Sequence, residues 1–132
     1  MSKLRNGLAG ILALVMLLGS QAINAAAIIA NPAALNFGPQ EIFTSSPSQQ
    51  ITLTRIDIEL TGAAVDIQSL SVTAGFIENN NCPAQLTSTN PSCTVNVSSV
   101  PGAVGFYNGT FQVNYQDAST NVAGSDTVAL TG

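Results

Sequence analysis

The chain has 132 residues and a formal net charge of −4, and only 8% of its residues are charged, against roughly 25% in an average soluble protein. It contains no His, and its three basic residues are Lys3, Arg5 and Arg55. These counts leave no imidazole for general-base catalysis or metal ligation. They also provide too few cations for a nucleic-acid footprint. We therefore expect one domain and no nucleic-acid partner.

Residues 1–27 have the pattern of a secretory signal peptide. Lys3 and Arg5 form a positive amino-terminal region, an uncharged apolar run follows over residues 8–18, and Ala25, Ala26 and Ala27 offer an A-x-A cleavage site. Residues 23–25 offer a second cleavage site. The apolar run is shorter than the roughly 20 residues that a membrane-spanning helix needs. We predict export of residues 28–132 to the periplasm, the cell surface or the medium, without membrane insertion after cleavage.

Cleavage would make the product strongly acidic. Arg55 would then stand alone against seven acidic residues, one minus seven, or −6. No Lys would remain, so Schiff-base chemistry has no amine side chain. Such a surface repels nucleic acids and anionic membranes.

The rest of the chain alternates apolar and polar residues, with Gly, Pro, Asn and Ser between the runs. This period of two predicts strands, and no segment has the apolar spacing and caps of a helix. Phe111, Val113 and Tyr115 should face the core. Short strands separated by turns favour a β-sandwich. The expected strands are 34–37, 51–54, 56–60, 65–67, 70–72, 93–97, 110–116 and a final strand around Val128 and Leu130.

Two of these runs change phase. The apolar positions are odd over 51–54 and even over 56–60, and a similar change occurs between 65–67 and 70–72. A one-residue slip would turn the apolar face toward solvent. We therefore predict a β-bulge or a break at each place, the first near Thr54 and Arg55.

Cys82 and Cys93 are the two cysteines of the chain. In an exported protein this pair predicts a disulfide. A redox pair favours C-x-x-C spacing, and two thiolates without His make a poor zinc site. We expect the bridge to hold the polar loop 83–92 against the sheet.

An ordered set of short motifs covers most of residues 32–132. In order they are LNFG at 35–38, LTG at 60–62, VDI at 65–67, NC at 81–82, SCTVNV at 92–97, Pro101 with Gly105, TFQV at 110–113 and VALTG at 128–132. The set resembles the secreted bacterial form of the abnormal-spindle/hydin-type immunoglobulin-like domain, which recurs in "choice-of-anchor D" proteins and is related to the major sperm protein fold. The resemblance implies a seven-stranded immunoglobulin-like β-sandwich that serves as a structural or binding module. It implies no catalytic residues.

Asp57 and Glu59 are the closest pair of acidic residues with a possible role in chemistry. Carboxylates two positions apart on one strand face lie about 7 Å apart, a separation that glycoside hydrolysis could use in a cleft. We expect instead a solvated strand face with a weak ion pair to Arg55. We regard Asp57 and Glu59 as candidate surface binding residues and predict no catalytic residue.

Two further ligand-binding features are weak in the sequence. Residues 78–81 read Glu-Asn-Asn-Asn, which supplies oxygens that calcium could use, but no D-x-[DN]-x-[DN]-G loop is present. We expect a polar loop there, and no metal or cofactor. Tyr107 follows Gly105 and Phe106 in a turn and could stack on a sugar, whereas Tyr115 is in phase with the core.

These observations favour an exported, non-enzymatic module that works through contacts with a protein partner or with itself. Lys, a common blocker of edge strands, is absent after cleavage, so edge strands would be poorly guarded. One alternative is a fimbrial or filament subunit that completes a neighbour's sheet by strand addition, with residues 28–37 as the donor strand. Another is a carbohydrate- or calcium-binding module.

Overall fold

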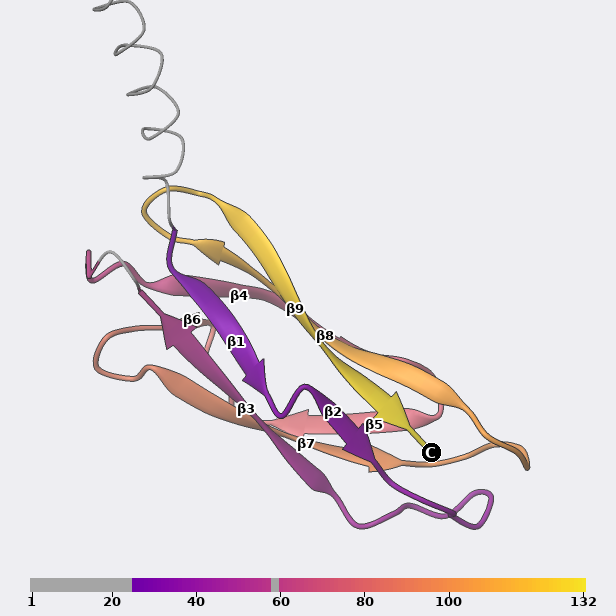
Figure 1. Ribbon diagram of the computed structural model, residues 1–132. Coiled ribbons are helices and arrows are strands. Elements are labelled where there is room, and N and C mark those ends of the chain that lie inside the picture. The colour runs from indigo at the N-terminus through magenta and orange to yellow at the C-terminus, as the bar shows by residue number, and fades with distance from the viewer. Residues whose placement is uncertain (1–24, 58–59) are drawn as a thin grey trace, which may run out of the picture.

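A computed structural model describes residues 25–57 and 60–132, and within them the protein is built from strands alone (Figure 1). Most of the predicted signal peptide therefore lies outside the described residues. Its last predicted residue, Ala27, begins the first strand. The strands are β1 (Ala27–Asn31), β2 (Ala34–Asn36), β3 (Gln49–Ile56), β4 (Val65–Val72), β5 (Phe76–Asn80), β6 (Gln85–Leu86), β7 (Ser92–Ser99), β8 (Asn108–Asp117) and β9 (Ala123–Thr131).

The strands form two sheets. One sheet has the order β1-β3-β7-β5, and the other has the order β2-β9-β8-β4-β6. All neighbours are antiparallel except β2 and β9, which are parallel. The two amino-terminal strands, β1 and β2, belong to different sheets, and Pro32 lies where the chain crosses between them. Pro has no N–H group, so its position between the sheets leaves no backbone donor without a partner.

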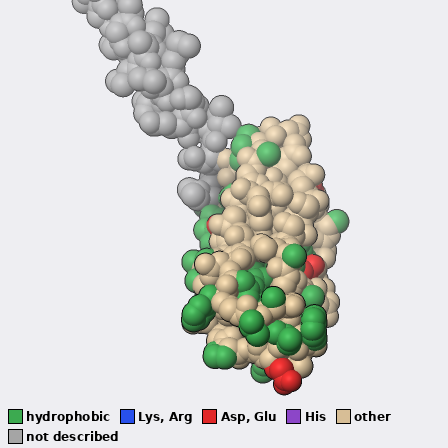
Figure 2. Space-filling view, turned by 90° about the vertical axis from the view of Figure 1, so that its right-hand side faces the viewer, with side chains coloured by type: hydrophobic (Ala, Val, Ile, Leu, Met, Phe, Trp, Pro, Cys, Tyr) green, Lys and Arg blue, Asp and Glu red, His purple; other side chains and the backbone are tan. Residues whose placement is uncertain are grey.

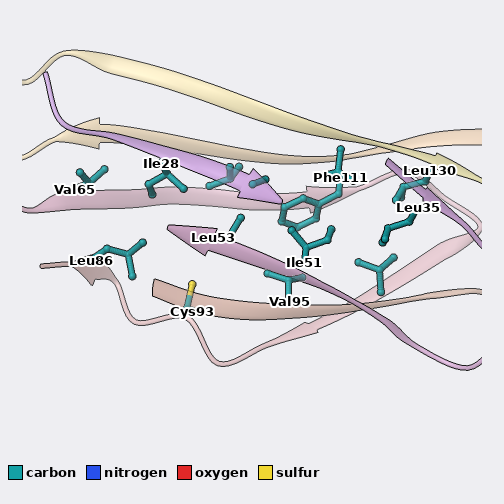
Figure 3. Close-up of a cluster of buried hydrophobic side chains, with 14 of the residues drawn as sticks. Ile28, Leu35, Ile51, Leu53, Val65, Leu86, Cys93, Val95, Phe111 and Leu130 are labelled. Carbon is teal, nitrogen blue, oxygen red and sulfur yellow. The ribbon is translucent and has the colours of Figure 1, made fainter. Parts of the chain in front are cut away.

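The core lies between the sheets and follows the period-two pattern of the sequence (Figure 3). In β7 the side chains of Cys93, Val95 and Val97 are buried, and in β8 those of Phe111 and Val113 are fully buried. Tyr115 is partly buried and packs against this cluster. The prediction of an all-β sandwich is confirmed, with nine strands in the described part of the chain where seven were expected. The strands that the sequence pattern did not predict are β1, β5 and the two-residue β6, and the expected strands 65–67 and 70–72 form the single strand β4.

The two phase changes have different structural origins. In β4 the register with β8 shifts between Ile67 and Ser69, so the predicted bulge is present there. Near Arg55 the structure has the predicted break and no bulge, because β3 pairs in continuous register and then ends at Ile56. Of the expected strand 56–60, only Ile56 belongs to a described strand, and residues 58–59 lie outside the described residues. The N–H of Leu60 donates to the carbonyl of Asp57 at 3.2 Å.

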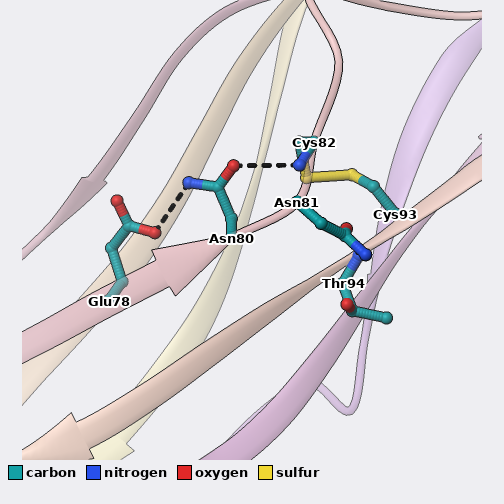
Figure 4. The surroundings of a disulfide bond; sticks show 6 residues. All are labelled: Glu78, Asn80, Asn81, Cys82, Cys93 and Thr94. Carbon is teal, nitrogen blue, oxygen red and sulfur yellow. Dashed lines mark hydrogen bonds between the residues drawn. A yellow bond between two sulfur atoms is a disulfide. The ribbon is translucent and has the colours of Figure 1, made fainter.

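The predicted disulfide between Cys82 and Cys93 is present (Figure 4). It ties the segment after β5 to the start of β7, and these two strands are neighbours in one sheet. The expectation of a simple polar loop at 83–92 was incomplete. The segment crosses to the other sheet, where β6 pairs with β4, and it buries the side chain of Leu86 fully. The bridge thus closes a loop that joins both sheets.

The outer edge of β1 is held by carboxylates from the other sheet. The N–H of Ala26 donates to Asp117 Oδ2 at 2.7 Å, and the N–H of Ala30 donates to Asp126 Oδ2 at 2.8 Å. Residues an even number of positions apart in a strand direct their N–H groups the same way. Both N–H groups therefore point outward from the edge of β1 that faces away from β3. The predicted donor segment 28–37 covers β2 and all of β1 except Ala27, and these strands pair with β9 and β3 of the same chain.

Candidate interaction surface

Large apolar side chains lie exposed on two loops at one end of the sandwich. The β2–β3 loop carries Ile42 and Phe43, and the β7–β8 loop carries Val104 and Phe106. Phe106 is 100% exposed, Val104 89% and Phe43 77%. Figure 2 shows hydrophobic side chains gathered toward the lower end of the molecule. Figure 1 shows the carboxyl terminus at this same end.

Between these loops lies a groove of about 1050 Å³, which we call the apolar end groove. Both loops and the carboxyl-terminal residues contribute to it. Apolar side chains and glycines make up most of its wall, and Glu41 is the one charged side chain in it. Its lining residues are Asn36, Gly38, Pro39, Gln40, Glu41, Ile42, Pro101, Ala103, Val104, Gly105, Phe106, Tyr107, Asn108, Thr131 and Gly132.

A row of three aromatic rings supports the groove from the core side. The ring centroids of Phe37 and Phe76 lie 5.7 Å apart, and those of Phe76 and Tyr107 lie 5.2 Å apart. Tyr107 also hydrogen-bonds to the hydroxyl of Ser99, and its carbonyl accepts from the N–H of Gly132 at 3.0 Å. Tyr107 is therefore half-buried and fixed in place, and the fully exposed aromatic ring is that of the preceding Phe106.

Backbone hydrogen bonds join the two loops at their bases. The N–H of Phe43 donates to the carbonyl of Pro101 at 2.8 Å. Ser46 and Ser99 are linked twice, through Ser46 N–H to the Ser99 carbonyl at 2.9 Å and through Ser99 N–H to Ser46 Oγ at 2.9 Å. A groove whose walls are tied together in this way loses less conformational entropy when it binds a ligand.

The acidic pair singled out in the sequence is not part of this groove. Asp57 forms a salt bridge with Arg55 at 2.8 Å, and the two side chains are 7% and 8% exposed. It also accepts a hydrogen bond from the N–H of Gly62 at 2.7 Å. Desolvation acts to raise the pKa of Asp57, but hydrogen bonds from the main chain of Gly62 and Thr61, with the nearby Arg55, lower it below the usual value. Glu59 lies outside the described residues.

The oxygens of residues 78–81 are used in hydrogen bonds around the disulfide (Figure 4). Asn80 Nδ2 donates to Glu78 at 2.9 Å, and Asn80 Oδ1 accepts from the N–H of Cys82 at 3.0 Å. Asn81 Oδ1 accepts from the N–H of Thr94 at 2.8 Å. In the described ranges, no three acidic or cysteine side chains come together as a metal-binding group. The prediction of a polar loop at 78–81 was wrong for residues 78–80, which belong to β5. The cluster fixes the chain between β5 and the bridge.

Comparisons with known proteins show the fold. No protein-family model matches the chain, and no curated protein sequence matches it. The structure of the VesB protease of Vibrio cholerae aligns with a TM-score of 0.60 and 18% identity, over 82% of this chain and 31% of the protease. Domain 7 of human CEP192, an ASH/PapD-like domain, aligns with a TM-score of 0.59 and 14% identity, over 80% of this chain and 82% of that domain.

These alignments define an immunoglobulin-like β-sandwich, as the sequence predicted. At this level of sequence identity the alignments show the fold of the chain, and they say nothing about its activity. The match to VesB covers less than a third of that chain. The match to the ASH/PapD-like domain supports the resemblance at the level of the fold. No helix in residues 25–57 and 60–132 is long and apolar enough to cross a membrane.

Proposed function

We propose that the protein is an exported, non-enzymatic immunoglobulin-like module that binds a protein partner through the apolar end groove. The observation that carries this proposal is that the exposed Phe106, Val104 and Ile42 line one groove, on two loops that are hydrogen-bonded to each other. Exposed apolar side chains gathered in one place mark interaction sites on soluble proteins. Aromatic residues in such places often dominate the binding energy.

The chemistry of the groove limits the partner. Its wall is mostly apolar, with one charged side chain, Glu41, and the described part of the chain has one cationic side chain, Arg55, which is paired with Asp57. The partner surface should therefore present an apolar segment without a cluster of acidic residues. An acidic partner would meet repulsion that no cation here offsets.

Export is supported by two features of the chain. The first 27 residues have the pattern of a signal peptide, and the bridge between Cys82 and Cys93 belongs to an oxidising compartment. We also propose membership of the secreted "choice-of-anchor D" group, on the motifs described above. A fimbrial role by strand addition would need residues 28–37 to leave β3 and β9 and pair with another copy.

The proposal is tested by retention of partners on the exported, oxidised protein from the extracytoplasmic fraction of the organism that makes it. We compare the native chain with the double variant Val104→Ser/Phe106→Ser and with Ser125→Ala, an exposed control on β9. The native chain and the control should retain the same proteins, and the double variant should lose them. Equal retention by all three chains would exclude the groove as the binding surface.

A further inference from the structure

The carboxylate of Asp117 is buried beside the start of the described chain. Its side chain is 1% exposed. Oδ1 accepts from the N–H of Ser119 at 2.7 Å, from Ser119 Oγ at 2.8 Å and from the N–H of Thr120 at 2.9 Å. Oδ2 accepts from the N–H of Ala26 at 2.7 Å. All four donors in this set are uncharged groups.

Buried charges in proteins are usually paired with an opposite charge, and the described part of the chain offers no cation to pair with Asp117. Arg55 is the single cationic side chain in residues 25–57 and 60–132, and its salt bridge goes to Asp57. The nitrogen of Ala26 could carry such a charge, and it already donates a hydrogen bond to Oδ2. A peptide nitrogen is neutral, but the first nitrogen of a mature chain carries a positive charge at neutral pH.

We propose that the leader is removed by cleavage between Ala25 and Ala26, and that the new α-ammonium group of Ala26 forms a buried salt bridge with Asp117. The step is hydrolysis by an endopeptidase of the export machinery. Water adds across the Ala25–Ala26 peptide bond, Ala25 receives the carboxylate, and the nitrogen of Ala26 is released as an amine that is protonated at neutral pH. This proposal rests on the export described under the proposed function.

The burial of Ala25 and Ala26 favours cleavage of the Ala25–Ala26 bond over cleavage after Ala27. Ala26 is 2% exposed and belongs to the core cluster, whereas Ala25 is only partly buried. Cleavage after Ala27 would remove Ala26 from the core and leave Asp117 Oδ2 without its donor, and an unsatisfied buried acceptor is destabilising. Cleavage after Ala25 keeps Ala26 in the core and keeps its hydrogen bond to Asp117. Residues 23–25, with a small residue at the end, are one of the two cleavage patterns in the sequence.

The first test is the intact mass of the exported protein. We express the full chain in a bacterium with a working secretion system and measure the mass of the extracytoplasmic product. The proposal predicts an oxidised chain that starts at Ala26. A product lighter by two alanines, starting at Ile28, or any other start would overturn it while leaving export in place. A full-length chain retained in the cytoplasm would overturn both the cleavage site and the export.

The second test measures the charge pair itself. A chain that starts at Ala26 contains no Lys, so an amine-acetylating reagent modifies its α-amino group alone. The acetyl group takes the place of the Ala25 carbonyl, which keeps the N–H donor to Asp117 and removes its charge. We expect the acetylated chain to melt lower by roughly 4 °C or more, and acetylation of the Asp117→Asn variant to have little effect.

A chain that starts at Ala25 provides a check that leaves Asp117 untouched, should Asp117→Asn fail to fold. It retains every contact of Ala26 and moves the amine one residue away from the carboxylate. Its Tm should fall to near that of the acetylated chain. If acetylation or the added Ala25 leaves the Tm unchanged, or if acetylation lowers the Tm of Asp117→Asn equally, the ammonium group does not pair with Asp117.

Discussion

Asp126 on β9 accepts a hydrogen bond at 2.8 Å from the N–H of Ala30 on β1, although 96 positions separate the two residues. This contact joins the edge strand of one sheet to the opposite sheet. It also uses an N–H group that would otherwise be free to pair with a strand of another molecule. Asp126 thus holds β1 in place and closes its outer edge.

Replacement of Asp126 by Ala should loosen β1. The variant leaves the Ala30 N–H without its partner, and loss of a hydrogen bond to a charged acceptor costs about 1–3 kcal/mol. Urea unfolding should show that loss, and hydrogen exchange should be faster in β1 than in β7. Ser125→Ala, on the exposed neighbouring position, should leave both measurements unchanged. Equal protection of β1 in the two variants would mean that Asp126 does not hold this strand.

Gly124 should not tolerate a side chain. A Cβ atom at this position would lie 2.6 Å from the Tyr115 ring and hydroxyl, closer than side-chain atoms approach. Gly124→Ala should therefore displace Tyr115 and lower the free energy of unfolding by about 1–3 kcal/mol, as overpacking does. Gly102→Ala is the matched control, because nothing lies within 4 Å of its added Cβ. Similar Tm values for the two variants would show that Tyr115 moves aside without loss.

Reduction of the disulfide should lower stability. The bridge spans a sequence separation of 11 residues, and a loop of this size is worth roughly 3 kcal/mol in the chain-entropy model. A reducing agent should lower the Tm of the native chain and have no effect on the Cys82→Ala/Cys93→Ala variant. Because the loop contains β6, hydrogen exchange at Leu86 should increase first. An unchanged Tm under full reduction would mean that the bridge is not structural.

A charge in the core should prevent folding. Val113 is fully buried and pairs directly with Asp126 across β8 and β9. Val113→Asp would bury a carboxylate without a partner and place it opposite a like charge, and both effects are strongly destabilising. Circular dichroism should show an unfolded chain, whereas Thr127→Asp, on an exposed position, should remain folded. A folded Val113→Asp chain would overturn the assignment of the inward face of β8.

Stability should fall at acidic pH, partly through Asp117. Burial raises the pKa of this carboxyl, but hydrogen bonds from Thr120, Ser119 and Ala26 outweigh burial and hold the pKa far below its usual range. The group therefore stabilises the fold above its unfolded pKa of about 3.9. That contribution is lost as pH falls below this value toward the folded pKa. The difference in unfolding free energy between the native chain and Asp117→Asn should shrink between about pH 5 and pH 2, and a constant difference would contradict this role.

The period-two pattern was sufficient to predict the strands that have one buried and one polar face. The alternation in β7 and β8 is regular because each strand covers the core on one side only. The pattern failed at β1, β5 and β6, and residues 76–80 of β5 read Phe-Ile-Glu-Asn-Asn without alternation. Residues 27–31 read Ala-Ile-Ile-Ala-Asn without alternation, and β6 has two residues in a polar segment. Both strands are fixed by contacts with distant residues, which local periodicity does not contain.

The candidate site was less predictable than the fold. The sequence pointed to Asp57, Glu59 and Tyr107, yet Asp57 pairs with Arg55 and the N–H of Gly62 away from the groove, and Tyr107 supports the groove from the core side. Ile42 and Phe106, which both line the groove, were missed because they lie 64 positions apart in segments that carry no period. The one signal available was the presence of large apolar residues in two turn-rich segments, 38–48 and 100–107. Their proximity depends on the pairing of the sheets.

The most direct test of the proposed function is photo-crosslinking at the groove in living cells. A photoreactive amino acid is placed at Phe106 in one chain and at the exposed Ser125 of β9 in another, and each chain is exported by the organism that makes it. We expect a discrete adduct to one protein from position 106 and none from position 125. Adducts of the same pattern from both positions, or no adduct from position 106, would contradict the assignment of the apolar end groove as the binding surface.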